Sequence, residues 1–254
     1  MSKRVLLIDA DVLAYNAAFA CEKATEWEPG YWTWNVIWDE VVEEFDNQLA
    51  QIMVKLKGDE IKLCLTDSEG NFRFGVLPTY KGQRTTVRKP IVLKAFKQWL
   101  IDERQAYFKP GLEGDDCMGI LATRSNPTNE QRIIVSIDKD MKTIPGWFIR
   151  WGTEDAELTF IREDEADYWH LYQTLTGDTT DGYKGCPKVG PKGAEAILSG
   201  ADAAEHGAWA AVVKAYEKAG LNEAEAITQA RCARILRATD YDFKKKEPIL
   251  WTPQ

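Results

Sequence analysis

The sequence has few of the residues that soft metal sites and histidine catalysis require. Its 254 residues include two histidines, His170 and His206, and five cysteines that form no CxxC pair. Thiolate zinc sites need paired cysteines at short spacing, so this pattern argues against one. An odd number of scattered cysteines is typical of free thiols in a reducing compartment, and we therefore expect a cytoplasmic protein.

Long apolar runs are also missing. No stretch approaches the roughly 18 apolar residues of a membrane-spanning helix, so no membrane contact is expected. The first residues, MSKRVLLIDAD, reach an acid at position nine and leave no room for the apolar core of a signal peptide. With 44% hydrophobic and 28% charged residues, the chain is typical of a soluble globular protein of one large or two modest domains.

Acidic residues are absent from 70–101, although the whole chain carries a net charge of −8. This stretch instead has seven positive charges, on Arg73, Lys81, Arg84, Arg88, Lys89, Lys94 and Lys97. Charge is therefore segregated along the chain, and the acidic average describes no single surface. A nucleic-acid partner is not excluded.

Strands and helices alternate over residues 1–163, which predicts an α/β core with a central, mostly parallel sheet flanked by helices. Apolar runs predict strands over 5–8, 61–66 and 132–137, and apolar periodicity predicts helices over 12–19, 38–56, 95–101 and 118–123. Residues 22–37 are polar, then aromatic, around a Pro-Gly turn, and indicate an insertion or a hairpin. The pattern then becomes helical over 164–175, 194–198, 203–219 and 223–238, which predicts a helical C-terminal region of residues 164–254 packed with the core as one body.

Three of the predicted strands lead into an aspartate, at Asp9, Asp67 and Asp138. Ligands of open parallel sheets bind beyond the carboxyl ends of the strands, so we expect these acids to converge there. For any one of them, capping of the following helix is an equally good explanation. The capping explanation weakens when further acids gather around the same predicted edge: Glu113, Asp115 and Asp116 in GLEGDD, Asp140 in SIDKD, and Asp178 and Asp181 in TGDTTD.

So many carboxylates in one crevice would raise one another's pKa and destabilise the fold unless cations neutralised them. Oxygen-only ligands select hard ions, which predicts two Mg²⁺ ions with Mn²⁺ as a substitute. Two such ions about 4 Å apart form the clamp that enzymes use for phosphodiester hydrolysis. A calcium loop is the competing explanation, but its D-x-D-x-D-G pattern with a glutamate at the twelfth position is absent.

The segment GYKGCPKVGPKG follows the last two acids and is rich in glycine and lysine. A phosphate-binding P-loop is excluded, because Pro191 follows the spaced Gly185 and Gly190 where that motif has lysine. An isolated hairpin of this composition is more often a structural turn. Beside Asp178 and Asp181, however, it indicates a helix, a glycine hairpin and a second helix over about 178–198, whose N–H groups and lysines hold a nucleic-acid backbone without recognising its bases. The residues expected to bind DNA here and in the basic stretch are Arg73, Arg88, Lys89, Lys184, Gly185, Lys188, Gly190, Lys192 and Gly193.

Six motifs together resemble the 5'-nuclease family, which includes flap endonucleases, the 5'-nuclease domains of bacterial DNA polymerases and the 5' to 3' exonucleases of short-tailed phages. They occur in the family's order and span nearly the whole chain: LIDAD, LTDSEGNFR, PTYKGQR, LEGDDCMG, SIDKDMKTIPG and GDTTDGYKGCPKVGPKGA. The resemblance implies a PIN-like nuclease core and a helix-hairpin-helix element that tracks duplex DNA. It also implies one metal cluster from Asp9, Asp67, Glu113, Asp115 and Asp116, and a second from Asp138, Asp140, Asp178 and Asp181.

The resemblance also assigns roles outside the acids. Lys81 and Arg84 match basic residues of the family that contact the scissile phosphate, and Tyr15 matches an aromatic residue that stacks on a terminal base. Tyr15 could equally be a core residue. Two departures stand out. Asp11 replaces a small polar residue and is either an outer ligand or a helix cap. The stretch TTVRKPIVL after Arg84 is shorter than the arch through which many relatives thread a 5' strand, which leaves threading open.

The sequence is therefore interpreted as that of a monomeric, metal-dependent 5' to 3' DNA exonuclease of phage replication, recombination or host-DNA breakdown. Its expected substrates are duplex DNA with 5' ends, nicks or flaps, and the RNA of RNA–DNA hybrids. A phage-encoded enzyme would act in the bacterial host cytoplasm. Two alternatives remain open: a PIN-type ribonuclease, which has no need of the hairpin, and a non-catalytic protein that binds DNA structures, for which the clustered acids would only reduce stability.

Overall fold

The core of the fold is a five-stranded sheet. The computed structural model describes residues 2–82, 88–153 and 156–253. The strand order is β4 (Glu60–Cys64), β1 (Arg4–Asp9), β5 (Gln131–Ser136), β6 (Gly146–Arg150) and β7 (Leu158–Ile161). The first four are parallel and β7 pairs antiparallel to β6, which confirms the predicted mostly parallel sheet. The sequence analysis did not predict β6 and β7, since both are short and lie toward one edge of the sheet.

Strand β1 is central because both its faces are covered. Its residues Val5 to Ile8 are almost fully buried, and its register pairs Leu7 with Lys62 of β4 and with Ile134 of β5. A continuous apolar run is what a parallel strand between two helical layers requires. The strand ends at Asp9, which caps the next helix by accepting a hydrogen bond from the Val12 N–H.

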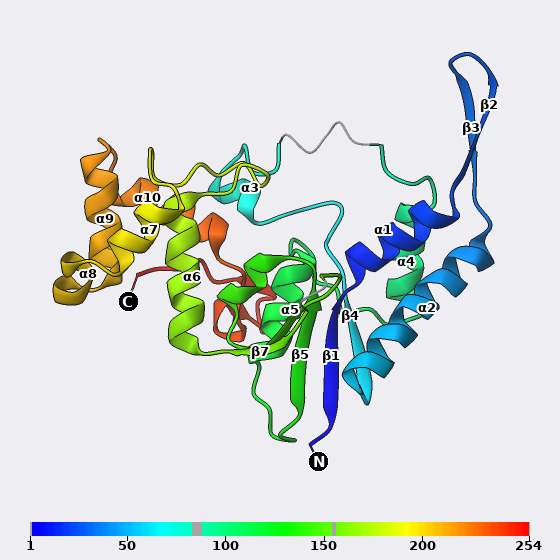
Figure 1. Ribbon diagram of the computed structural model, residues 1–254, viewed down its shortest axis with the longest axis horizontal. Helices are drawn as coiled ribbons and strands as arrows, with labels where there is room; N and C mark the ends of the chain where they lie inside the picture. The colour runs from blue at the N-terminus through cyan, green and yellow to red at the C-terminus, as the bar shows by residue number, and fades with distance from the viewer. Residues whose placement is uncertain (1, 83–87, 154–155, 254) are drawn as a thin grey trace.

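Helices cover both faces of the sheet (Figure 1). One face packs against α1 (Ala10–Cys21), α2 (Trp38–Leu56) and α4 (Leu93–Asp102), where Phe45 of α2 and Phe96 of α4 meet edge to face. The other face packs against α5 (Gly114–Thr123) and the segment around Ile235 and Leu236 near the C-terminus. These helices agree with the predicted apolar periodicities, and the layers leave the carboxyl ends of the strands at one edge.

Residues 22–37 contain a β-hairpin, the second of the two predicted possibilities. Strands β2 (Lys23–Glu28) and β3 (Tyr31–Asn35) pair antiparallel around Gly30, whose φ of +84° favours glycine. Every residue of both strands is exposed, and the hairpin projects away from the body of the protein (Figure 1). The aromatic residues of this segment therefore do not belong to the core.

The C-terminal region consists of α6 (Glu163–Thr176), α7 (Pro191–Leu198), α8 (Ala201–His206), α9 (Ala208–Lys218) and α10 (Glu223–Ala233). Helices α6, α7, α9 and α10 share a small apolar cluster that includes Leu175, Val212 and Tyr216. The helix predicted over 203–219 is divided at Gly207, whose φ of +89° interrupts helical geometry. The helix predicted to 238 ends at Ala233. The boundary between residues 163 and 164 stays a prediction.

Shorter elements complete the chain. Helix α3 (Arg73–Val76) lies in the basic stretch, and 3-10 helices η2 (Lys139–Thr143) and η3 (Ala238–Asp240) follow β5 and α10. A two-stranded ladder of β8 (Tyr241–Asp242) and β9 (Glu247–Pro248) lies near the C-terminus. Among the helices that the structure describes, none has both the length and the apolar character of a membrane span.

His170 of α6 is buried between α10 and the C-terminal segment. Its Nε2 lies 2.9 Å from the Ala230 carbonyl oxygen, and its ring packs edge to face on Trp251. Burial lowers the pKa of His170 to about 3, and the charges of Arg234 and Arg237 act in the same direction. The imidazole is therefore neutral in the folded protein.

This burial predicts a pH-dependent stability. In the unfolded chain the imidazole titrates near 6.5, so between about pH 6.5 and about pH 3 only the unfolded state binds the proton. The free energy of unfolding should fall as the pH drops through this window, by about 2 kcal/mol between about pH 7 and about pH 5. Urea denaturation of the protein and of His170→Gln at both pH values measures it. Equal pH dependence of the two proteins would contradict the assignment.

Candidate active site

The predicted acids lie along the carboxyl edge of the sheet. Asp9 is the last residue of β1, Asp67 comes three residues after β4, and Asp138 comes two residues after β5. Asp115 is at the start of α5, and Asp178 and Asp181 lie in the connection between α6 and α7. The parallel topology thus brings residues from distant parts of the sequence to one edge.

Asp9, which is buried, and Asp115, which is half-buried, are two neighbouring acids of this edge. The Ser136 hydroxyl donates to Asp9 Oδ2 at 2.9 Å, yet burial and the charge of Asp11 raise the pKa of Asp9 to about 6. Desolvation, followed by the charges of Asp9 and Asp138, raises the pKa of Asp115 well above its ordinary value. These carboxylates repel one another, and hydrogen bonds within the protein relieve only part of that repulsion.

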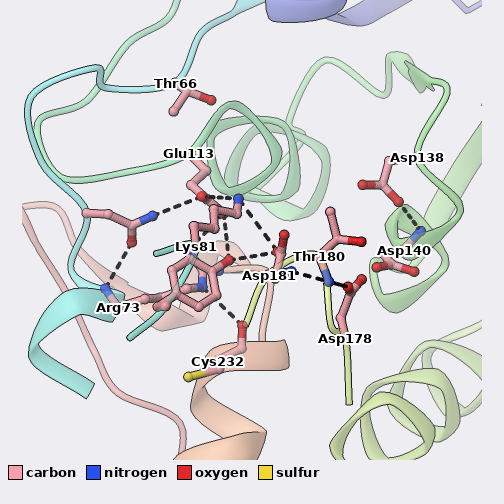
Figure 2. A network of polar contacts seen from close by, with 12 residues as sticks. Thr66, Arg73, Lys81, Glu113, Asp138, Asp140, Asp178, Thr180, Asp181 and Cys232 are labelled. Atoms are coloured by element: carbon pink, nitrogen blue, oxygen red, sulfur yellow. Dashed lines mark hydrogen bonds and ion pairs between the residues drawn. The ribbon is translucent and has the colours of Figure 1, made fainter. Parts of the chain in front are cut away.

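A second group of acids comes from two segments, one after β5 and one after α6 (Figure 2). Asp138 Oδ1 accepts a hydrogen bond from the Asp140 N–H at 2.8 Å, and Asp178 Oδ1 accepts one from the Thr180 N–H at 2.6 Å. Desolvation and the charge of Asp138 raise the pKa of Asp140 to about 6, and Asp178 contributes in the same sense. The two segments therefore face each other across a shared concentration of negative charge.

Glu113 lies in a network that contains the predicted catalytic lysine (Figure 2). Lys81 forms an ion pair and hydrogen bond with Glu113 Oε1, and its Nζ lies 3.6 Å from Asp181 Oδ2. The Tyr80 hydroxyl lies 2.9 Å from Asp181 Oδ2 and 3.2 Å from Glu113 Oε2, within donating distance of both. Burial acts to raise the pKa of Glu113, but the charges of Arg73 and Lys81 hold it below its ordinary value.

Lys81 is held in place by its own backbone as well. Its φ of +52° is unusual for a residue with a side chain, and its N–H donates to the Asp181 carbonyl oxygen at 2.7 Å. The loop before it packs on Gly182, where a Cβ would lie 2.9 Å from the Thr79 carbonyl oxygen. The structure therefore brings Lys81 together with the acids, as expected, by docking one loop on the other.

Asp116 and Arg73 require a correction. Asp116 was expected to bind metal and Arg73 to contact DNA, but both are interior residues, 0% and 2% exposed. The guanidinium donates to both oxygens of Asp116 at 2.8 Å, and the Leu236 and Glu113 N–H groups donate to the same carboxylate. A carboxylate so fully engaged leaves no oxygen for a metal, and a buried guanidinium cannot reach a phosphate. Both residues lie beneath the acidic edge and hold its segments in place.

Asp67 and Asp11 are half-buried acids with defined partners. The Glu69 and Gly111 N–H groups donate to the two oxygens of Asp67 at 2.8 and 2.7 Å, which orders the loops on either side. Asp11 pairs with Lys97 at 2.6 Å and accepts from the Thr66 N–H at 2.8 Å. Asp11 is thus neutralised by the basic stretch, whereas Asp67 still lies at the acidic edge and remains a candidate ligand.

The acids suit a divalent cation in charge and in donor chemistry. Their donors are all carboxylate oxygens, which hard ions prefer, and the raised pKa values of Asp9, Asp115 and Asp140 show uncompensated negative charge. Within residues 2–82, 88–153 and 156–253, however, no three His, Cys, Asp or Glu residues are grouped closely enough to hold an ion as placed. The acidic edge therefore has the charge and the donor atoms that a divalent cation requires, but the structure does not define which residues would coordinate the ion.

The other residues expected to contact DNA differ in their exposure. Those of the α6–α7 connection and the start of α7 are mainly at the surface: Lys184, Lys188, Gly190 and Lys192 are exposed and Gly193 is half-buried. Lys89 is exposed, while exposed Arg88 pairs with Glu22 and lies over the Trp34 ring. Tyr15 is half-buried and stacks on Phe19. Arg84 lies outside the described residues.

Gly185 is a further correction. Its N–H was expected to bind a phosphate, but Gly185 is buried and its N–H donates to Gln229 Oε1 at 2.9 Å. A Cβ at this position would lie 2.4 Å from the Gly177 nitrogen, so glycine is required for close backbone packing. Gly185 therefore shapes the connection. The N–H groups that the start of α7 can offer a ligand are those of Lys192 and Gly193, because Pro191 has none and the Ala194 N–H donates to the Gly190 carbonyl oxygen at 2.9 Å.

Several residues of the site escaped the sequence analysis. Tyr80 and Asn71 both hydrogen-bond Glu113, and Ser136 hydrogen-bonds Asp9. Tyr80 directly precedes Lys81, and Ser136 is the last residue of β5, two residues before Asp138. Their position beside predicted site residues is the only signal that could have identified them, because their polar groups are common in loops of every kind.

Comparison with known proteins assigns the chain to a family. Residues 4–150 match the model of the 5'-3' exonuclease, N-terminal resolvase-like domain. The chain belongs to the 5'-3' exonuclease family. An exodeoxyribonuclease of Enterobacteria phage T3 is 33% identical over 99% of this chain and 94% of its own length, and an exonuclease of Escherichia phage T7 is 32% identical with the same coverage. The family expected from the motifs is therefore confirmed.

Solved structures show the same fold for this 5'-3' exonuclease family member. A T5 protein crystallised with metal ions has a TM-score of 0.65 at 13% identity, covering 93% of this chain and 90% of that one. A T5 flap endonuclease in a pseudo-enzyme-product complex with DNA and metal ions has a TM-score of 0.60 at 14% identity, covering 91% of each chain. The likeness confirms the predicted fold class. The helix-hairpin-helix character of residues 178–198 stays a prediction.

The buried pair gives a stability prediction. Arg73→Met should lower the free energy of unfolding by about 3–5 kcal/mol, because it leaves the Asp116 carboxylate buried without its partner. Lys94→Met, which breaks the exposed pair with Glu69, should change it by less than about 1 kcal/mol. Denaturant titration measures both. The double variant Arg73→Met with Asp116→Leu should recover part of the loss, and failure to recover any would show that the charge of Asp116 is not its cause.

Proposed function

We propose that this 5'-3' exonuclease hydrolyses phosphodiester bonds of duplex DNA at 5' ends, nicks or flaps, with two Mg²⁺ ions that Mn²⁺ can replace. The single observation that carries the proposal is the acidic edge with Lys81 in its midst. Uncompensated carboxylates at the carboxyl ends of parallel strands reduce stability unless a cation neutralises them. Their presence here therefore supports a cation-dependent function. The family and the phage relatives supply the reaction class.

The chain's own acids divide into two sets that would hold the ions. Asp9, Asp67, Glu113 and Asp115 would hold one, and Asp138, Asp140, Asp178 and Asp181 the other. Bound divalent cations supply an activated water and neutralise charge on the phosphoryl oxygens. The two sets lie on different loops, so the scissile phosphate would be placed between segments that come from both halves of the chain.

Lys81 would stabilise the charge that develops on the phosphoryl oxygens. Its ion pairs with Glu113 and Asp181 hold the ammonium group at the acidic edge before substrate arrives. A preorganised positive charge needs no rearrangement during the reaction, which is why such groups stabilise transition states strongly. Arg84 would assist it.

The exposed lysines of the α6–α7 connection would hold the duplex. Lys184, Lys188 and Lys192 would contact phosphates, together with the first-turn N–H groups of α7, and none of these contacts reads a base. We extend the proposal to the RNA strand of RNA–DNA hybrids, to a monomeric enzyme and to a role in phage replication, recombination or host-DNA breakdown. Cleavage of 5'-labelled duplex, with and without Mg²⁺, tests it against a ribonuclease and against a non-catalytic DNA-binding protein.

Asp138→Asn should abolish cleavage and leave duplex binding within about tenfold of the native protein. Loss of one charged ligand removes transition-state stabilisation more than ground-state affinity. Turnover is measured on 5'-labelled duplex in Mg²⁺, and binding by fluorescence anisotropy in Ca²⁺. Asp102→Asn at the end of α4 makes the same chemical change elsewhere and should leave turnover unaltered. More than a tenth of native turnover in Asp138→Asn would contradict the assignment.

Lys81→Ala should lower turnover by about two orders of magnitude or more, because it removes one preorganised charge at the phosphoryl centre. Single-turnover cleavage of saturating substrate measures the step directly. The matched control is Lys3→Ala, since Lys3 precedes β1 at the opposite edge of the sheet and pairs with Glu60. A rate equal to that of Lys3→Ala would show that Lys81 only neutralises Glu113.

A further inference from the structure

A cavity of about 260 Å³ lies beside the acidic edge, between α1, α2 and the ends of β1 and β5. Part of its wall belongs to the candidate site. Asp9 and Ser136 line it, and so does Ile137, the residue before Asp138. The Ser136 hydroxyl donates to Asp9 Oδ2 and joins the two strand ends. A group held between Asp9 and Asp138 would therefore be next to this cavity.

Of the described residues that line the cavity, three carry side-chain amides. Asn16 comes from α1, and Gln48 and Gln51 come from one face of α2, since they are three residues apart. Gln48 donates to Glu44 Oε1 at 2.8 Å. Within the described residues, no protein group hydrogen-bonds the exposed side-chain amides of Asn16 or Gln51. Each of these two amides thus has a donor and an acceptor to offer a ligand.

The remaining walls are apolar and include one aromatic side chain. Leu13 and Ile52 are buried and line the cavity together with Trp151. The Trp151 N–H donates to the Ser136 carbonyl oxygen at 3.0 Å, and Lys55 Nζ lies 4.9 Å from the centroid of the indole ring. These contacts hold the indole beside the end of β5. Apolar and aromatic walls next to hydrogen-bonding amides suit a planar heterocycle.

Charge and size narrow the ligand further. Asp9 is the only charged residue among the described residues of the lining, so an anion would be repelled and a neutral group is favoured. The volume is just below the roughly 300–1,000 Å³ of sites that bury drug-sized ligands, which suits a single heterocycle. Asparagine and glutamine amides pair well with the hydrogen-bonding edges of nucleobases.

We propose that this cavity is a nucleobase subsite, which takes the base of the 5'-terminal nucleotide while the phosphodiester of that nucleotide lies at the acidic edge. The inference rests on the proposed function, because that function brings a nucleotide to Asp9 and Asp138. Asn16 and Gln51 would hydrogen-bond the base, and Trp151 would contact its ring.

The cavity is distinct from the residue of α1 that was expected to stack on a terminal base. Tyr15 directly precedes Asn16, and consecutive residues of a helix point about 100° apart. Tyr15 stacks on Phe19 and is not among the described residues that line the cavity. The two placements of the terminal base therefore predict different neighbours, Trp151 for the cavity and Tyr15 for stacking.

Photocrosslinking locates the base directly. A duplex with 5-iododeoxyuridine as its 5'-terminal nucleotide is bound in Ca²⁺ and irradiated, and the attachment site is mapped by mass spectrometry. We expect attachment to Trp151 in the native protein and several-fold less in the double variant Asn16→Ala with Gln51→Ala. Attachment to Tyr15 in place of Trp151 would overturn the inference.

The matched control is Asn47→Ala with Gln98→Ala, which makes the same chemical change at two exposed positions outside the cavity. It should attach to the probe at Trp151 as the native protein does. Thermal unfolding verifies that both double variants are folded. Equal attachment in the two double variants would also overturn the inference.

An abasic substrate gives a second readout. Removal of the 5'-terminal base should raise several-fold the DNA concentration that gives half-maximal single-turnover cleavage by the native protein and by the control. The Asn16→Ala, Gln51→Ala variant should show this rise with intact DNA, and loss of the base should add nothing, because both changes remove the same contact. Full additivity of the two effects would contradict the subsite.

Two sources could supply the base: the strand being cut and the free nucleotide that cleavage releases. Irradiation of the native protein with 5-iododeoxyuridine 5'-monophosphate, without DNA, distinguishes them. Attachment to Trp151 would show that the released nucleotide also occupies the cavity, and attachment from the duplex alone would assign the cavity to the strand. Attachment from neither would overturn the inference. Failure of the proposed function is distinguishable, because then the native protein itself would not cut duplex in Mg²⁺.

Discussion

The buried ion pair between Arg73 and Asp116 connects the parts of the chain on which the site depends. Arg73 begins α3 in the basic stretch, and Asp116 lies in the first turn of α5 among the acids. The guanidinium also donates to the Cys232 and Arg234 carbonyl oxygens, at 3.1 and 2.6 Å, at the end of α10. One side chain thus fixes three segments relative to one another.

A buried pair of this kind is not in itself a strong source of stability, because desolvation of both charges offsets much of their attraction. Its value here is positional. With Asp116 engaged from behind, Asp115 is left at the edge of the sheet, and Glu113 is close enough to Arg73, at 3.6 Å, for its pKa to be lowered. The three acids of GLEGDD therefore have different roles: Asp116 is a structural residue inside the protein, whereas Glu113 and Asp115 belong to the acidic edge.

The sequence predicted the fold where local pattern and tertiary context agree. The strand-then-aspartate pattern placed Asp9 and Asp138 at one edge because parallel topology leaves no other arrangement, and the spacing from Trp38 predicted α2 over its full length. Strands β6 and β7 were missed because segments of four or five residues carry weak periodicity. Gly207 divided one predicted helix through a positive φ that the apolar pattern does not encode.

The site was predicted less completely, for a physical reason. Composition shows which residues carry charge but not which charges are already paired. Arg73, Asp116 and Gly185 have the residue types of a binding site, and each is instead satisfied inside the protein. Tyr80 and Ser136 show the converse, since their hydroxyl groups contact the acids without any motif that distinguishes them from other loop residues.

The α6–α7 connection places acidic residues close to a lysine-rich loop. Asp178 and Asp181 lie at its start, where the Lys81 loop docks through the Asp181 carbonyl oxygen, while Lys188 and the first turn of α7 lie at its end. Close packing of Gly177 on Gly185 folds the connection back between these ends. A cation at the acidic end and a phosphate at the basic end would then be held by one short, tightly packed segment. The polypeptide backbone of the connection fixes the distance between its two ends, so under the proposed function a DNA strand held at the lysines would reach the acids at a set distance along the strand.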